Sequence, residues 1–307
     1  MFSITFSPTL NPFSHEYQSS VATTSKRPQY CLAKIVAALC NGAFSISSLS
    51  FSCSRQILFE RRYVAHGGRR RKRPHHDGYR IPNTPENIQK AVSSIIHTRP
   101  GVADGVSFSD KLNVQEITKD ALYVGLRISF SADVAGVCCD MKVDIGFSDE
   151  VYPAALMLDY PTTISGIPAA HIQCYSLESV IAEKWQAMVQ LKQMNSRMKD
   201  FYDLWFLSRR YSFAYDTLKE AISRTFDRRA THVNEYTALK TDNYQKAQQA
   251  EWAAYIRKMK AATFQKKNDV EIPSRIFADV IDEILSWLEP VMNDAQYHTW
   301  KPGIGWR

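Results

Sequence analysis

The sequence predicts an α+β fold in which a sheet is followed by a bundle of helices, with an irregular extension in front. Residues 121–131 and 137–147 alternate apolar and polar side chains, which indicates two half-buried strands. From Ser176 almost to the end, apolar residues recur at helical spacing. The first 80 residues show neither period. With 307 residues and 45% apolar content, the chain can bury a sizeable core.

The positive charge of the chain is concentrated at its N-terminal end. Residues 1–75 contain 11 Lys/Arg against two acids, whereas the remainder contains 27 Lys/Arg against 29 Asp/Glu, which is −2. This distribution excludes a globally basic enzyme. We predict a basic, disordered segment over residues 1–83. Its arginine run, residues 69–73, is interpreted as a solvated linker, a nucleic-acid-binding arm or a targeting signal.

Cysteine spacing and hydropathy indicate a cytoplasmic protein. None of the six cysteines lies at the Cys-x-x-Cys spacing of a zinc or redox motif. The most apolar N-terminal stretch, residues 32–51, is interrupted by Lys34 and several serines, so we predict no membrane span.

Capping signals place the helices and the domain boundaries. Thr84, Pro85 and Glu86 open a short helix, and Ser176 opens the first helix of the bundle. Prolines and glycines in residues 148–170 predict a loop with short strands. The predicted helices of the bundle cover residues 176–191, 196–211, 215–226, 243–260 and 273–288. The predicted domains are an α/β region over 84–175, a helical domain over 176–290 and a tail over 291–307.

Asp144 is a candidate metal ligand on the second predicted strand. It lies between Val143 and Ile145, with Asp140 four residues earlier on the same face of the strand. A carboxylate on a rigid strand commonly binds a divalent cation, because Mg²⁺ prefers oxygen ligands. The alternative is structural: Asp144 caps a turn at Gly146.

Lys184 and two aspartates are a second candidate group. Lys184 interrupts an apolar helix, and Asp200 and Asp203 lie one turn apart on the next helix, where residues three apart share a face. The alternative is that Lys199 and Asp203 form an i,i+4 ion pair while Lys184 is solvated.

Arg127 interrupts the first predicted strand and either extends to solvent or holds an anionic oxygen through its fork of donors. No Gly-x-Ser-x-Gly or Gly-x-x-x-x-Gly-Lys motif occurs in the sequence, which excludes serine-hydrolase and P-loop chemistry of the usual kind.

Two longer stretches of the sequence read YSLESVIAEKWQAMV and NSRMKDFYDLWFLSRRY. Together they resemble the central signature of the bacterial AbiEii/AbiGii toxin family of nucleotidyltransferases. The resemblance extends upstream through DGVSF, YVGLRISF and VDIGFSD, and downstream through LKEAISRTFDRRATH and the helix that contains Trp252. It covers about residues 84–290 and implies a partial polymerase-beta-like nucleotidyltransferase mixed sheet with a helical bundle behind it.

The resemblance also implies an activity and a set of site residues. Members look like the toxins of toxin–antitoxin or abortive-infection systems, which transfer a nucleotide from an NTP, with tRNA or another RNA as acceptor. Asp144 matches a catalytic, Mg²⁺-binding carboxylate. Lys184 matches a lysine that is both catalytic and nucleotide-binding, Asp200 a catalytic acid, and Arg127 and Asp203 nucleotide-binding residues. A cognate antitoxin is implied as partner.

The sequence departs from the family at its front end. Members carry a Gly-Gly or Gly-Ser turn and an Asp-x-Asp pair ahead of this region, and residues 1–83 contain no match to them. We therefore expect activity to be reduced or absent, and we keep as an alternative a non-catalytic remnant that binds nucleotide, RNA or an antitoxin. Loss of the first strands predicts an open sheet edge beside residues 121–147.

Overall fold

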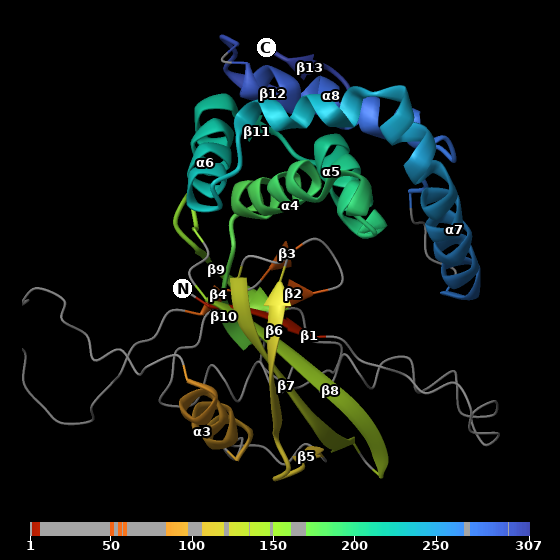
Figure 1. The fold of residues 1–307 in the computed structure, drawn as a ribbon. Helices are drawn as coiled ribbons and strands as arrows, with labels where there is room; N and C mark the ends of the chain where they lie inside the picture. Colours follow the sequence, from red (N-terminus) through yellow and green to blue (C-terminus); the bar gives the residue numbers. More distant parts are fainter. Residues whose placement is uncertain are drawn as a thin grey trace, which may run out of the picture. The chain divides into compact units, whose positions relative to one another are not determined.

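We analysed a computed structural model of the chain (Figure 1). It describes residues 2–6, 50–51, 55–56, 58–59, 84–97, 106–119, 123–134, 136–147, 150–160, 170–266, 271–293 and 295–307. The chain divides into two compact units, Met1–Asp149 with Ala155–Tyr175, and Glu150–Ala154 with Ser176–Arg307. Strands dominate the first unit and helices the second, so the predicted α+β fold is confirmed.

The main sheet of the first unit has eight strands in the described residues. They are β1 Phe2–Phe6, β2 Ser50–Phe51, β3 Arg55–Gln56, β4 Leu58–Phe59, β5 Val106–Phe108, β6 Asn113–Lys119, β7 Tyr123–Val134 and β8 Val137–Phe147. The order is β3-β2-β1-β8-β7-β5, with β4 beside β1 and β6 beside β7. Only β1 and β2 pair in parallel among these strands, so the sheet is mixed.

In the long hairpin of β7 and β8, buried and less buried side chains alternate as the sequence pattern predicts. Leu126, Ile128 and Phe130 of β7 are buried opposite Ile145, Val143 and Met141 of β8. The side chains between them are polar and lie on the other face, since successive strand residues point to opposite sides. Gly136 lies in the turn between the two strands with a φ of 83°, and its amide donates to Asp133 Oδ1 over 3.0 Å. Both predicted strands are confirmed.

Helix α3, Pro85–Ile96, is the helix predicted after Thr84. The Thr84 side chain accepts a hydrogen bond from the Asn87 amide over 3.4 Å, as an N-cap residue does. Its buried face contains Val92, Ile95 and Ile96. Figure 1 shows α3, coloured orange, within the unit that contains the main sheet.

The N-terminal segment, to which the sequence assigned no strand, contributes β1–β4. Strand β1 pairs antiparallel with β8 from Phe2↔Phe147 to Phe6↔Val143. The edge of β8 that we expected to be open is therefore paired. Five residues with one apolar alternation are too short to stand out from a Ser-rich and Pro-rich stretch. The arginine run at 69–73 lies outside the described residues, so its interpretation stays a prediction.

Two short strands follow the hairpin. Strands β9, Leu156–Tyr160, and β10, Ala170–Cys174, form a separate antiparallel pair. Short strands within residues 148–170 were predicted, and β9 lies inside this range, whereas β10 begins at its last residue.

The second unit contains the five helices predicted for the bundle. They are α4 Leu177–Leu191, α5 Met198–Arg210, α6 Tyr215–Arg228, α7 Asp242–Lys266 and α8 Phe277–Met292, with short 3-10 helices η2 Lys192–Met194 and η3 Val233–Lys240. Their ends differ from the predicted ends by up to six residues. Trp185, Trp252 and Trp287 are completely buried between them. No helix in the described parts of the chain is both long and apolar enough to cross a membrane.

Residues 291–307, predicted as a tail, fold onto the helices. Strand β11, Phe213–Ala214, pairs with β12, Thr299–Lys301, and β12 pairs with β13, Gly305–Trp306. The Trp306 indole donates to the Trp287 carbonyl over 2.8 Å, which fixes β13 to α8 (Figure 1). Strands of two or three residues are too short for an alternating pattern to be recognised.

Candidate functional site

The sheet brings Arg127 and Asp144 together as direct neighbours. They are register partners on β7 and β8, and both belong to the polar face of the hairpin. Arg127 Nε donates to Asp144 Oδ1 over 2.6 Å and Nη2 donates to Oδ2 over 2.7 Å. The arginine side chain is 40% exposed and the aspartate side chain 20%.

The contact between Arg127 and Asp144 bears on the alternatives that the sequence left open for each of the two residues. Arg127 holds an anionic oxygen, and in this structure that anion is Asp144. The hydrogen bonds that the Arg127 guanidinium donates to Asp144, followed by the charge of Asp144, raise the pKa of that guanidinium. Strand β8 continues through Gly146, whose backbone pairs in register with Ser3, so Asp144 does not cap a turn there.

The described residues do not by themselves fit the Mg²⁺ that the family resemblance implies. Within the described parts of the chain, no three His, Cys, Asp or Glu side chains group closely enough to hold a metal ion. Both oxygens of Asp144 accept hydrogen bonds from Arg127. A metal site needs several oxygen ligands, and one guanidinium-bound carboxylate does not provide them.

The helical unit brings Lys184, Asp200 and Asp203 together between α4 and α5. The Lys184 ammonium donates to Asp200 Oδ1 in a very short contact and lies 2.8 Å from Asp203 Oδ2. Asp203 is also held by Lys199, whose ammonium donates to both of its oxygens over 2.8 and 2.6 Å. We call these four residues the lysine–aspartate cluster.

Burial distinguishes the members of the lysine–aspartate cluster. Asp203 is 2% exposed, Asp200 and Lys184 are 13% and 14% exposed, and Lys199 is 41% exposed. Burial alone would lower the pKa of Lys184, but the charges and hydrogen bonds of Asp200 and Asp203 outweigh it and raise the pKa above its usual value. Lys184 is therefore a permanent cation at neutral pH.

The alternative interpretation of the sequence was a Lys199–Asp203 ion pair with a solvated Lys184. The ion pair is present, but Lys184 is not solvated: it contacts both aspartates. Sequence reasoning placed Lys199 only in a helical ion pair and missed that it shares Asp203 with Lys184. It also missed Tyr255 of α7. Burial and the nearby carboxylates of the cluster raise the pKa of the Tyr255 phenol. No local pattern links Tyr255 to residues more than 50 positions earlier.

Helix α4 is positioned by its cap and by a buried polar network. The Ser176 hydroxyl accepts from the Ser179 amide over 3.1 Å, which confirms the predicted cap. On the same helix, the fully buried Gln186 accepts from Arg229 Nη1 over 2.7 Å and donates to Thr231 over 2.7 Å. These contacts fix α4 against the segment that follows α6.

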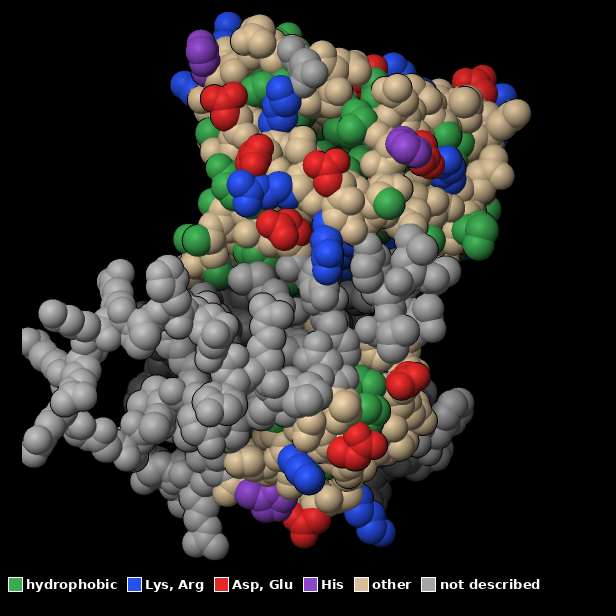
Figure 2. All heavy atoms as spheres, turned by 60° about the vertical axis from the view of Figure 1, so that its left-hand side comes forward, with side chains coloured by type: hydrophobic (Ala, Val, Ile, Leu, Met, Phe, Trp, Pro, Cys, Tyr) green, Lys and Arg blue, Asp and Glu red, His purple; other side chains and the backbone are tan. Residues whose placement is uncertain are grey.

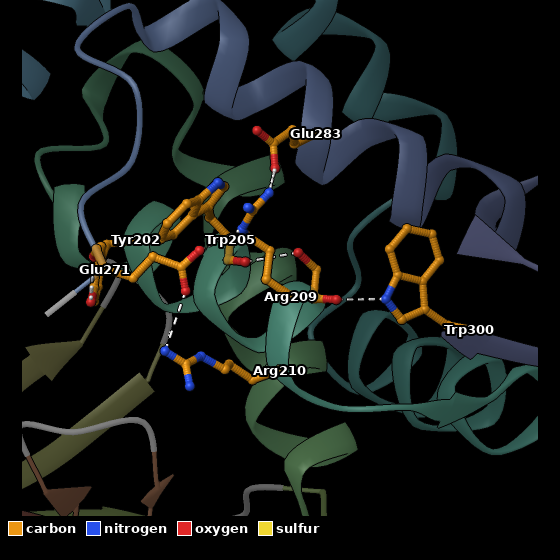
Figure 3. Close-up of polar contacts among 8 residues, drawn as sticks. Tyr202, Trp205, Arg209, Arg210, Glu271, Glu283 and Trp300 are labelled. Carbon is orange, nitrogen blue, oxygen red and sulfur yellow. Dashed lines mark hydrogen bonds and ion pairs between the residues drawn. The ribbon is translucent and has the colours of Figure 1, made fainter. Parts of the chain in front are cut away.

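Helix α5 is anchored at its C-terminal end (Figure 3). Arg209 Nε donates to Glu271 over 2.9 Å and Nη1 donates to Glu283 of α8 over 3.1 Å. The Trp300 indole donates to the Ser208 carbonyl over 2.7 Å. The helix that carries both aspartates of the cluster is thus held by α8 and by the C-terminal strands.

Charges of both signs are mixed on the surface of the helical unit. On the face shown in the upper part of Figure 2, Lys/Arg and Asp/Glu side chains are interspersed. Several charged side chains of the helical unit form ion pairs, such as Lys240 with Glu289 and Arg224 with Glu220. This face offers no patch of one sign, in agreement with the near-neutral charge expected beyond residue 75.

A protein-family model matches the larger part of the chain. The model described as "Nucleotidyl transferase AbiEii toxin, Type IV TA system" matches residues 79–274, which is more than half of the chain. The match includes Arg127, Asp144 and the whole lysine–aspartate cluster. None of the curated proteins searched matches the chain.

Proposed function

Because the chain belongs to the AbiEii nucleotidyl transferase toxin family, we propose that it transfers a nucleotide from an NTP to an RNA acceptor such as tRNA, as the toxin of a toxin–antitoxin system. In this reaction an acceptor hydroxyl attacks the α-phosphorus of the NTP. A new phosphorus–oxygen bond forms, the bond to the β-phosphate oxygen breaks, and pyrophosphate leaves while a base takes the hydroxyl proton. A cognate antitoxin is the proposed partner.

One observation carries the proposal: a permanently charged lysine lies between two aspartates at the centre of the family match. The Lys184 ammonium remains partly accessible and would contact the triphosphate, whose charge increases on its leaving side as the bond breaks. Asp200, also partly exposed, would orient Lys184 before the NTP arrives. Asp203 is nearly inaccessible, which favours a supporting part in nucleotide binding through its hydrogen bonds to the two lysines.

Arg127 and Asp144, which we call the sheet pair, are proposed to act in acceptor activation and phosphate binding. Asp144 is an ionisable acceptor on a rigid strand and would orient the attacking hydroxyl. Arg127 directs Nε and Nη2 to Asp144, so Nη1 is the donor that would contact a phosphate oxygen. Dependence on Mg²⁺ is also proposed, from family membership alone, and would appear as loss of transfer when EDTA is added.

The test is label transfer by the full chain. Purified protein is incubated with each α-³²P-labelled NTP, Mg²⁺ and total tRNA, and the RNA is separated on a denaturing gel. Because the family's front-end motifs have no match in the sequence, we expect weak labelling of RNA with one preferred NTP, and loss of the label in Asp144→Ala. Asp140→Ala is the matched control, because Asp140 is an exposed acid four residues earlier on the same strand. Equal labelling by Asp144→Ala and the wild type would reject the role of Asp144.

A second candidate function is a non-catalytic binder of nucleotide, RNA or an antitoxin. It is favoured by the absence, in the described parts of the chain, of a carboxylate group that fits a metal. Under this proposal, NTP binds to folded protein and no label moves to RNA at any Mg²⁺ concentration. RNA binding by the arginine run at 69–73 would then weaken steeply with salt, since phosphate contacts release counterions.

A further inference from the structure

We propose that Lys199 is a positioning residue for NTP binding: it neutralises Asp203, which leaves the Lys184 ammonium free to exchange Asp200 for a phosphate oxygen. This inference rests on the proposed function, because it assumes that Lys184 contacts the triphosphate. It assigns a task to a lysine that would otherwise count as half of a helical ion pair.

The first step of the argument is the sharing of Asp203. Both of its oxygens accept hydrogen bonds from Lys199, over 2.8 and 2.6 Å, and Oδ2 also lies 2.8 Å from the Lys184 ammonium. A carboxylate that is only 2% exposed loses nearly all hydration, so it needs charged partners inside the protein. Lys199 supplies one of them from the solvent side.

The second step is the count of charges. With Lys199, the cluster has two cations and two anions and is neutral. Without Lys199, Lys184 alone would face two carboxylates, and the cluster would carry one negative charge. A negative cluster repels a triphosphate, and its buried location makes that repulsion poorly screened.

The third step identifies the partner that Lys184 can release. Asp200 is 13% exposed, several times more than Asp203, and its second oxygen has no hydrogen bond in the described part of the chain. Water can replace the ammonium on Asp200 but not on Asp203. A phosphate oxygen would therefore take the place of Asp200, while Asp203 keeps Lys184 in position.

A purely structural Lys199 would behave differently. An i,i+4 pair with one exposed partner contributes modestly to helix stability and is indifferent to ligand charge. A positioning Lys199 acts on binding only through the charge of Asp203. Removing that charge should therefore make Lys199 dispensable, which is a result that helix stabilisation does not produce.

The experiment measures NTP affinity of the full chain by isothermal titration calorimetry, using the NTP preferred in the transfer assay or, without transfer, each of the four. The variants are Lys199→Met, Lys199→Arg, Asp203→Asn and the double variant Lys199→Met/Asp203→Asn. We expect Lys199→Met to weaken binding by roughly fivefold to tenfold, and Lys199→Arg to restore it to within about twofold. In the Asp203→Asn background, Lys199→Met should change affinity by less than about twofold.

Two outcomes overturn the inference alone. One is wild-type affinity in Lys199→Met. The other is the same loss of affinity with and without the Asp203 charge, which would make Lys199 a direct phosphate ligand or a structural residue. A folded wild type that binds no NTP would overturn both this inference and the proposed function, whereas binding without label transfer would overturn only the proposed catalysis.

Discussion

The sheet pair and the lysine–aspartate cluster hold opposite charges together in contrasting ways. Arg127 and Asp144 are cross-strand neighbours on a partly exposed face, and their contact follows directly from the strand register. Lys184 and its aspartates come from two helices and lie mostly out of solvent, where they depend on tertiary packing. An ion pair therefore contributes little to the free energy of unfolding at the sheet, whereas removing one partner between the helices lowers that free energy strongly.

The strongest way to break this contrast is Lys184→Met. It removes the cation between Asp200 and Asp203 and leaves carboxylate charge in a poorly hydrated location. We expect the free energy of unfolding to fall by about 3 kcal/mol, the lower end for a buried pair because Lys199 still contacts Asp203. Urea denaturation followed by circular dichroism measures it.

Lys240→Met is the matched control for that change. Lys240 donates to Glu289 over 2.6 Å, but its side chain is 46% exposed. An exposed pair contributes little, so the control should unfold nearly as the wild type does. If both substitutions lowered the free energy of unfolding equally, burial would not make the ion pairs of the cluster stronger than an exposed pair.

At the sheet, the largest expected effect belongs to Gly125 rather than to the ion pair. A Cβ at this position would lie 2.8 Å from the Ile145 carbonyl oxygen and 3.3 Å from Ile117 Cγ1. Gly125→Ala should force the central strands apart and lower stability by about 2 kcal/mol, as overpacking does. A thermal melt unchanged from the wild type would show that the strands adjust without cost.

Arg127→Met is expected to cost only about 0.5 kcal/mol, because the arginine side chain is 40% exposed. The effect should shrink further in 1 M NaCl, where screening weakens exposed charges. Comparing unfolding curves of wild type and variant at low and high salt tests this. A salt-independent loss as large as that of Lys184→Met would remove the contrast between the two regions.

The smallest expected effect is a pH dependence confined to the sheet unit. His97 at the end of α3 faces two acceptors, the Ser93 carbonyl and Asp110, each over 2.6 Å. Only a doubly protonated ring donates to both, and these contacts raise the pKa of His97, with the Ser93 bond contributing most. Its stabilisation should be full below pH 6.5 and lost as pH rises through the raised pKa.

The comparison for His97 is the difference in unfolding free energy between wild type and His97→Gln from pH 5 to 9. We expect less than about 0.5 kcal/mol, since the ring is half exposed. A difference that grows with pH would contradict the assignment of a protonated ring. Lys184 should contribute no such dependence in this range, because its raised pKa lies above its ordinary value near 10.5.

Local patterns in the sequence were sufficient for the long elements. Thr84 and Ser176 allowed the starts of their helices to be predicted, because a cap is a local interaction. Strands β7 and β8 could be predicted because each is 11 or 12 residues long and shows a clear alternation of apolar and polar side chains. Strands β1, β12 and β13 were missed because pairing over a few residues is decided by the partner strand. Those strands depend on tertiary contacts such as that of Trp306 with Trp287.

The candidate site divides in the same way. Asp200 and Asp203 share a helical face by spacing alone, and family resemblance pointed to Lys184 as their companion. The pairing of Arg127 with Asp144 required the strand register, which the sequence does not state. The second task of Lys199 required the approach of α4 to α5, since nothing local shows that Asp203 has two lysines.

The measurement that tests the central claim most directly is amide hydrogen exchange with and without NTP, on the wild type and Lys184→Met. If the triphosphate binds the lysine–aspartate cluster, peptides covering residues 180–203 should exchange more slowly when NTP is added to the wild type, and the variant should show no such change. Unchanged exchange in these peptides despite saturating NTP, or identical slowing in Lys184→Met, would contradict the claim that Lys184 is the nucleotide-binding residue.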